Sequence, residues 1–109
     1  MKKSEFFAKY DILKRQETRD IEEVMSDAQN LRFIRNPTEA VCLAAVRKDG
    51  SVIQRILNPS EEVKLTAVKQ NGFAIQFIEN PSEEVMAAAL EQNLECLTMF
   101  KPEWFDPEV

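Results

Sequence analysis

Apolar and polar positions along this chain repeat with a period of 22 residues. Each clear unit begins at an Asn-Pro dipeptide, and these dipeptides start at Asn36, Asn58 and Asn80. The first two of these units share 11 of their 22 positions, and the last two share 9. Residues 14–35 keep the apolar pattern without Asn-Pro, so four units, the first of them degenerate, cover residues 14–101. An internal period of this length is typical of stacked supersecondary units.

The unit that follows the second Asn-Pro predicts a long helix and then a short one. Asn58 suits the N-cap position, proline suits the first helical position, and Glu61 lies three residues after the cap, where it can reach back to it. Gly72 is expected to end the long helix in the left-handed conformation, which glycine adopts without a steric penalty. Ile75 and Ile78 lie three residues apart on one face of the second helix. The matching residues in neighbouring units include Glu39, Glu83, Gly50, Ile53 and Ile56.

The predicted fold class is all-α, because no segment shows the alternating pattern of a β-strand. Two-helix repeats that stack at about 8–10 Å per unit predict a short right-handed α-solenoid with terminal caps, about 40 Å long. We expect one helical-repeat domain over residues 1–109. It comprises an N-terminal capping helix in 1–13, four repeats in 14–101 and a C-terminal tail in 102–109.

Both ends of such an array need a cap, because a terminal repeat otherwise exposes its apolar face. Residues 4–13 have the pattern of an amphipathic helix that covers the first repeat, with Ser4 as its N-cap. In the fourth repeat, Leu94 replaces the glycine. The tail places Trp104 and Phe105 between two prolines. Two interpretations of these aromatic residues stay open: they fold back over the last repeat, or they form a short aromatic and acidic ligand for a partner.

The string NPSEEVKLTAVKQNGFAIQFIENPSEEV resembles a poorly characterised bacterial and phage family of tandem α-helical repeats, in which units of the form NPSEEVxLAAVKQNGxAIxxI follow one another. The resemblance covers residues 36–101 well and the preceding unit weakly. It implies a helical-repeat fold of the kind found in proteins of mobile elements, and it implies no catalytic residues. The layout is similar to HEAT repeats only at the level of the fold.

The composition is that of one soluble globular domain, with 44% apolar and 30% charged residues among 109. The chain has no histidine, which removes the usual general base at neutral pH and the commonest metal ligand. Adjacent carboxylates, as at Glu61–Glu62 and Glu83–Glu84, recur where a helix begins, so we interpret them as helix-start residues. No glycine-rich phosphate loop is present. We therefore predict that the protein is not an enzyme and has no catalytic residues, no cofactor and no metal site.

The two cysteines, Cys42 and Cys96, lie far apart on apolar stretches and outside any CxxC spacing. We expect them to be buried core thiols of a reduced compartment, and a disulfide between them is the alternative. The apolar run near the N-terminus is broken by Lys9 and Asp11, so we predict neither a secretory signal nor a membrane span. A cytoplasmic location is expected.

Charge is distributed unevenly along the chain. Residues 1–19 carry +3, residues 20–79 carry −2 and residues 80–109 carry −6, which gives the net charge of −5. We do not expect direct binding to nucleic acid, because its affinity comes from clustered lysine and arginine. The acidic end suits a basic surface of another protein, including a groove that normally holds nucleic acid. The predicted partner-binding residues are Glu84, Glu91, Glu95, Trp104, Phe105, Asp106 and Glu108.

Repeat arrays present extended surfaces to partners, so the leading hypothesis is a non-catalytic protein–protein interaction module. Together with the resemblance, the acidity suggests a phage-encoded inhibitor that binds a host defence or nucleic-acid-processing protein through its acidic helical surface. The alternative is a self-assembling structural repeat protein whose unit ends pair into a homodimer. An enzyme is the third hypothesis.

Overall fold

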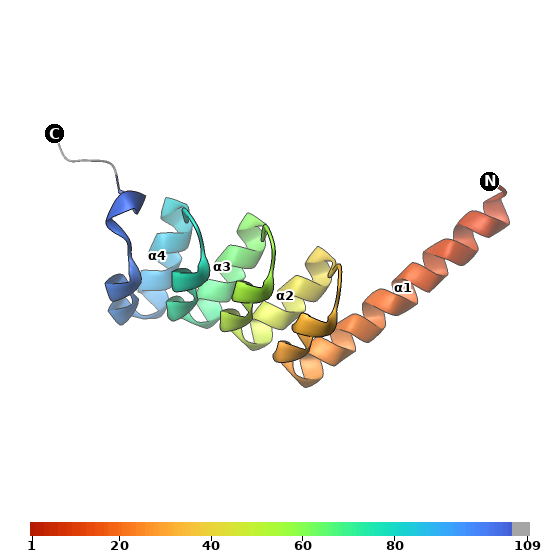
Figure 1. The fold of residues 1–109 in the computed structure, drawn as a ribbon, viewed down its shortest axis with the longest axis horizontal. Helices are drawn as coiled ribbons and strands as arrows, with labels where there is room; N and C mark the ends of the chain where they lie inside the picture. Colours follow the sequence, from red (N-terminus) through yellow and green to blue (C-terminus); the bar gives the residue numbers. More distant parts are fainter. Residues whose placement is uncertain (106–109) are drawn as a thin grey trace.

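A computed structural model describes residues 1–105, and every regular element in that range is helical. α-Helices alternate with 3₁₀ helices along the chain (Figure 1). The elements are α1 (Lys3–Ser26), η1 (Ala28–Phe33), α2 (Glu39–Lys48), η2 (Gly50–Arg55), α3 (Glu61–Gln70), η3 (Gly72–Phe77), α4 (Glu83–Gln92), η4 (Leu94–Met99) and η5 (Pro102–Trp104). The predicted all-α fold class is confirmed, and the short helix of each unit is a 3₁₀ helix.

The repeats stand in a single row, in which each α-helix of the described range packs on its neighbours along the chain and on no more distant α-helix. The 3₁₀ helices follow the same rule on the other side of each unit. The molecule is therefore elongated, with extents of 62 × 31 × 20 Å. Part of the length comes from α1, which projects beyond the row (Figure 1). The right-handed sense of the superhelix stays a prediction.

The core is built from apolar side chains that occupy the same position in successive repeats. Val24, Val46 and Val68 are one such series, and each is fully buried. No charged or polar side chain of residues 1–105 is buried. Stability of the row therefore rests on apolar packing between neighbouring units, with polar contacts confined to their edges.

The helix N-caps are not the asparagines that the sequence suggested. The side-chain hydroxyls of Thr38, Ser60 and Ser82 accept hydrogen bonds from the backbone N–H three residues later, and the helices begin at the following glutamates. Asn58 and Asn80 lie two residues before the caps, with φ of 52° and 46°. Asparagine tolerates this left-handed conformation better than most residues, so its role is to reverse the chain before the cap. The prediction of Asn at the N-cap was wrong.

The glycines are required by close packing, because neither has a positive φ. Gly50 and Gly72 begin η2 and η3. A Cβ atom at Gly50 would lie 2.2 Å from the carbonyl oxygen of Ala67, and one at Gly72 would lie 2.8 Å from that of Ala89. The left-handed glycine cap was therefore a wrong prediction. Each long helix ends at an extended Asp or Asn whose side chain caps the following 3₁₀ helix.

Polar contacts join neighbouring repeats at both ends of their interface. In the second interface, Oε1 of Gln70 accepts a hydrogen bond of 2.6 Å from the backbone N–H of Gly50. At the other end, the hydroxyl of Ser60 donates to the carboxylate of Glu39. Glu39 thus reaches the cap of the next repeat, whereas the sequence suggested contact with its own cap. The same contacts recur one repeat later, as Gly72–Gln92 and Ser82–Glu61.

The N-terminal region does not form a cap. α1 runs without a break from Lys3 to Ser26, and its N-cap residue is Lys2, so the prediction of Ser4 as N-cap was wrong. Every side chain from residue 3 to residue 16 is exposed. We call this segment, residues 3–16, the projecting half of α1. Nothing in the sequence interrupts the helix there, since residues 3–26 contain neither Gly nor Pro. The expected capping segment 4–13 therefore extends away from the array.

The C-terminal end of the row is covered in part by the tail. The Trp104 ring packs on Phe100, with ring centroids 5.6 Å apart, and Trp104 contacts the core as a partly buried residue. Phe105 stacks on Phe100 at 6.3 Å and stays 52% exposed. For Trp104 the structure favours the interpretation that the tail folds back over the last repeat.

Candidate protein-binding surfaces

The predicted partner-binding residues within the described range all lie in the last repeat or just after it. Glu84 and Glu91 are on α4 and Glu95 is on η4, and all three are exposed. Trp104 and Phe105 follow in the tail. The elements that carry these acidic residues, α4 and η4, lie at the end of the row opposite to the projecting half of α1 (Figure 1). The predicted residues Asp106 and Glu108 lie outside the described residues.

The last repeat leaves uncovered the positions that earlier repeats bury. Gly50 and Gly72 are buried, but Leu94 at the matching position is 77% exposed. Ile53 and Ile75 are buried, whereas Leu97 is 57% exposed. Val46 and Val68 are fully buried, and Leu90 is half-buried. We call Leu90, Leu94 and Leu97, with the neighbouring carboxylates Glu91 and Glu95, the terminal face.

The opposite end of the row is closed by polar residues. Arg19 and Glu23 of α1 stand where the later repeats have valine and alanine, and both are exposed. Val41 and Ala45, at the matching positions of α2, are fully buried. The first helix therefore presents a solvated outer side, as terminal repeats usually do. At the terminal face the outward positions stay apolar, with Leu94 and Leu97 exposed and Leu90 half-buried.

Leu94 prevents a further repeat from stacking on the terminal face in the usual register. At the interfaces that follow Gly50 and Gly72, the main chain of the next repeat leaves no room for a Cβ atom, and the matching residue of the first repeat is the small Ala28. A leucine side chain at that place would overlap a backbone carbonyl. A helix in the position that the repeats use is therefore excluded from the terminal face.

The electrostatics of the two ends differ. In residues 80–105, five acidic and one basic residue give a charge of −4, and residues 1–19 carry +3. Across residues 1–105 the structure contains one ion pair, between Lys14 and Glu17 at 3.9 Å, and it lies on α1. The carboxylates of the terminal face are therefore not neutralised by a cation of the described chain.

No group of three or more His, Cys, Asp or Glu side chains in residues 1–105 is placed to hold a metal ion. Cys42 and Cys96 are free and buried, as predicted. Burial raises the pKa of the Cys42 thiol, and the charge of Glu39 raises it further. Burial also raises the pKa of Cys96. Both thiols are held in the neutral form, which is the less nucleophilic one.

Two cavities recur one repeat apart beside the Asn-Pro loops. The first, of about 400 Å³, is lined by residues that include Arg35, Glu39 and Arg55. The second, of about 510 Å³, lies beside Lys64 and Phe77. Both cavities follow from the spacing of the repeats. Among their lining residues, only Cys42 of the first cavity has a shifted pKa.

Sequence reasoning missed the apolar part of the terminal face. The signal was present, because leucine at the glycine position and the charged residues Arg19 and Glu23 in the first unit differ from the repeat consensus. Comparison of these positions across the four units would have identified one closed and one open end. The residues that match Leu94 and Leu97 are buried in the earlier repeats, so the exposed leucines of the last repeat form an apolar surface.

Comparison with protein-family models, curated proteins and solved structures finds no match to this chain. The resemblance to a family of tandem helical repeats therefore stays a prediction. No helix within residues 1–105 is long and apolar enough to cross a membrane.

Proposed function

We propose that this protein is a non-catalytic interaction module whose acidic terminal face binds a basic surface of another protein. One observation carries the proposal: Leu94 and Leu97 are exposed beside Glu91 and Glu95 at positions that the earlier repeats bury. Apolar side chains supply binding free energy when they are covered, and unpaired carboxylates select the charge of the partner.

The acidic residues steer the partner rather than imitate a nucleic acid. Matching carboxylates of successive repeats stand about 10 Å apart, whereas duplex DNA carries a charge about every 1.7 Å of its axis. A basic groove that holds nucleic acid would be attracted to this end, but its contacts would be made by a helix face. The narrower hypothesis, an inhibitor of a host defence or nucleic-acid-processing protein, predicts that the partner cannot hold nucleic acid and this chain together.

The test is affinity capture with a tagged chain and with the variant that combines Glu84→Lys, Glu91→Lys and Glu95→Lys. We expect a partner to be retained by the parent chain and lost by the variant, and we expect retention to weaken at high salt. The matched control reverses three exposed glutamates elsewhere, Glu22, Glu23 and Glu62, and should retain the partner.

Two results would overturn the proposal. One is a partner that binds the parent and the acidic-end variant equally well. The other is a partner lost in both variants, which would show a general charge effect. If the captured protein binds nucleic acid, addition of duplex DNA should release it from the parent chain. Simultaneous binding would contradict the inhibitor hypothesis while leaving the interaction module intact.

A further inference from the structure

The projecting half of α1 presents an apolar stripe that nothing in residues 1–105 covers. Phe6, Tyr10 and Leu13 are 55%, 49% and 69% exposed. Their spacing of four and three residues places them on one helix face. Continued along α1, the same face reaches Val24, which is fully buried in the core. The side of α1 that packs on the core at Val24 therefore continues beyond the row, where no other element of residues 1–105 covers it.

Basic side chains flank this stripe. At about 100° per residue, Lys9 falls on one edge of the stripe and Lys14 on the other. The ammonium group of Lys14 lies 5.6 Å from the centre of the Tyr10 ring, beside the stripe. The acidic residues Glu5 and Asp11 fall on the remaining sides of the helix, whereas Glu17, just past the projecting half, lies in line with the stripe and pairs with Lys14 at 3.9 Å. The projecting half thus combines aromatic, aliphatic and basic residues on one surface.

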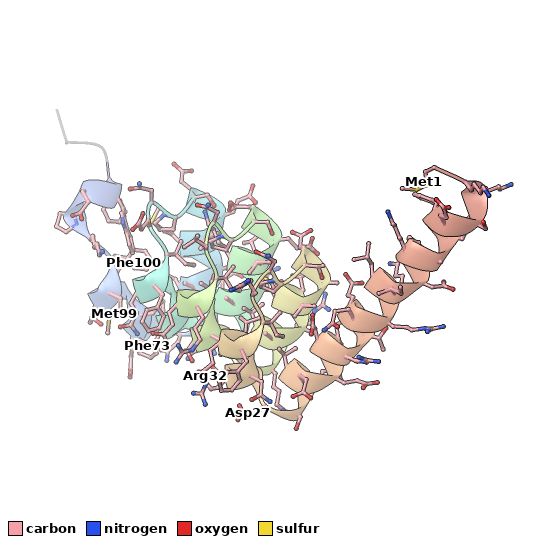
Figure 2. All side chains as sticks on the ribbon, turned by 45° about the vertical axis from the view of Figure 1, so that its right-hand side comes forward. Met1, Asp27, Arg32, Phe73, Met99 and Phe100 are labelled. Carbon is pink, nitrogen blue, oxygen red and sulfur yellow. The ribbon has the colours of Figure 1, made fainter. Side chains whose placement is uncertain are left out.

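The terminal face has the complementary character, since it offers three leucines and an excess of carboxylates. These two surfaces cannot meet within one chain, because they lie at opposite ends of the row. Figure 2 shows Met1 at the end of the projecting half, far from Phe100 at the other end. A contact between the two surfaces therefore needs a second copy of the chain. When two elongated molecules lie antiparallel, α1 of each one reaches the terminal face of the other.

We infer that two copies of this protein form a closed two-fold dimer, in which the projecting half of α1 from each copy packs on the terminal face of the other. Both contacts pair a basic apolar surface with an acidic apolar one, and the symmetry forms them together. Direct pairing of two α1 helices would bring the lysines that flank both stripes together. Addition of a copy as a fifth repeat is blocked by Leu94. This inference rests on the proposed function in one respect, because both assign the terminal face a basic partner.

The experiment measures the dissociation constant of the dimer by sedimentation equilibrium, from micromolar to millimolar chain. An N-terminal variant carries Lys9→Glu and Lys14→Glu, and a C-terminal variant carries Glu91→Lys and Glu95→Lys. Each variant alone should raise the dissociation constant at least about tenfold, a change of about 1.4 kcal/mol. An equimolar mixture of the two variants should restore the dimer, because both contacts in the mixed pair are complementary again. Reversal of Arg47 and Lys69, exposed in the middle of the row, should change little.

Four results would overturn the inference. A parent chain that stays monomeric over the whole range removes the dimer. A C-terminal variant that dimerises as tightly as the parent shows that the α1 helices pair with each other. A mass that keeps rising with concentration shows an open chain of molecules, and a mixture that does not associate removes the charge pairing. Circular dichroism of each variant shows that it is folded. A dimer without any captured partner refutes the proposed function alone, and capture by a monomer refutes this inference alone.

Discussion

Replacement of Gly50 by alanine tests whether the close approach of the second and third repeats requires glycine at this position. The Cβ atom of alanine would lie 2.2 Å from the carbonyl oxygen of Ala67 in the next repeat. Ordinary contact begins near 3.4 Å, so the two backbones must separate by about 1.2 Å, the difference of these values. A flexible side chain could move aside, but a helix carbonyl moves only with its helix. The substitution therefore strains the whole interface between the second and third repeats.

The magnitude follows from three contributions to the free energy of unfolding. Overpacking of a buried site costs about 1–3 kcal/mol. Displacement of the backbone weakens the hydrogen bond from the Gly50 N–H to Gln70, which costs about 1 kcal/mol more. Alanine restricts the unfolded chain and returns about 0.5–1 kcal/mol. The expected net loss is about 2 kcal/mol.

Urea unfolding followed by far-ultraviolet circular dichroism measures this loss, and Gly72→Ala is the internal comparison. At Gly72 the nearest atom is 2.8 Å away and the next is the flexible end of Gln92 at 2.9 Å, so a smaller loss is expected. Both substitutions restrict the unfolded chain by the same change from glycine to alanine, so the difference between their losses reports the packing. If Gly50→Ala costs no more than Gly72→Ala, the close approach is not the reason for glycine.

Three further predictions concern the caps, the contacts between repeats and the thiols. Ser60→Ala should lower the free energy of unfolding by about 1 kcal/mol through loss of the N-cap, whereas Asn58→Gly should be close to neutral at its left-handed position; the opposite order in urea titration would restore asparagine as the cap. Gln70→Ala leaves a buried backbone N–H without its acceptor, so we expect a loss of about 1–3 kcal/mol and faster hydrogen exchange at that amide; unchanged exchange would contradict the contact. Because burial raises the pKa of both thiols, stability should be complete below the unfolded-state thiol pKa of about 8.5 and should fall as the pH rises beyond it. Cys42→Ala with Cys96→Ala should flatten this decline, and an unchanged pH profile would assign it to other groups.

The repeat, its two helices and its buried thiols could be predicted from the sequence because each depends on a local and periodic pattern. The N-cap residue, in contrast, could not be predicted from the local pattern. Asn58 and Ser60 are both good capping residues, and two residues separate them. The choice depends on the turn that brings the chain back from the preceding 3₁₀ helix, which is a property of the stacked repeats.

The glycines and α1 show a second reason why some features could not be predicted from the sequence. Left-handed caps and close backbone approach both select glycine at Gly72, and only the position of the next repeat separates the two explanations. Likewise, the amphipathic pattern of residues 4–13 predicts a covered helix face without saying what covers it. The terminal face differs from the earlier repeats in sequence at Leu94, and its exposure follows from the stacking of the units.

The polar contacts between repeats make the third unit interchangeable with a copy of itself. Its Glu61 carboxylate accepts from the next unit and its Gly72 N–H donates to that unit, as Glu39 and Gly50 do toward the third unit. On its other side, the Ser60 hydroxyl donates to Glu39 and the Gln70 side chain accepts from the Gly50 N–H. A tandem duplication of the corresponding 66 nucleotides (22 × 3) would therefore yield a chain with one more unit and no mismatched interface. Such a gene could change the length of its product in whole steps, each about 10 Å, while both ends of the row stay the same.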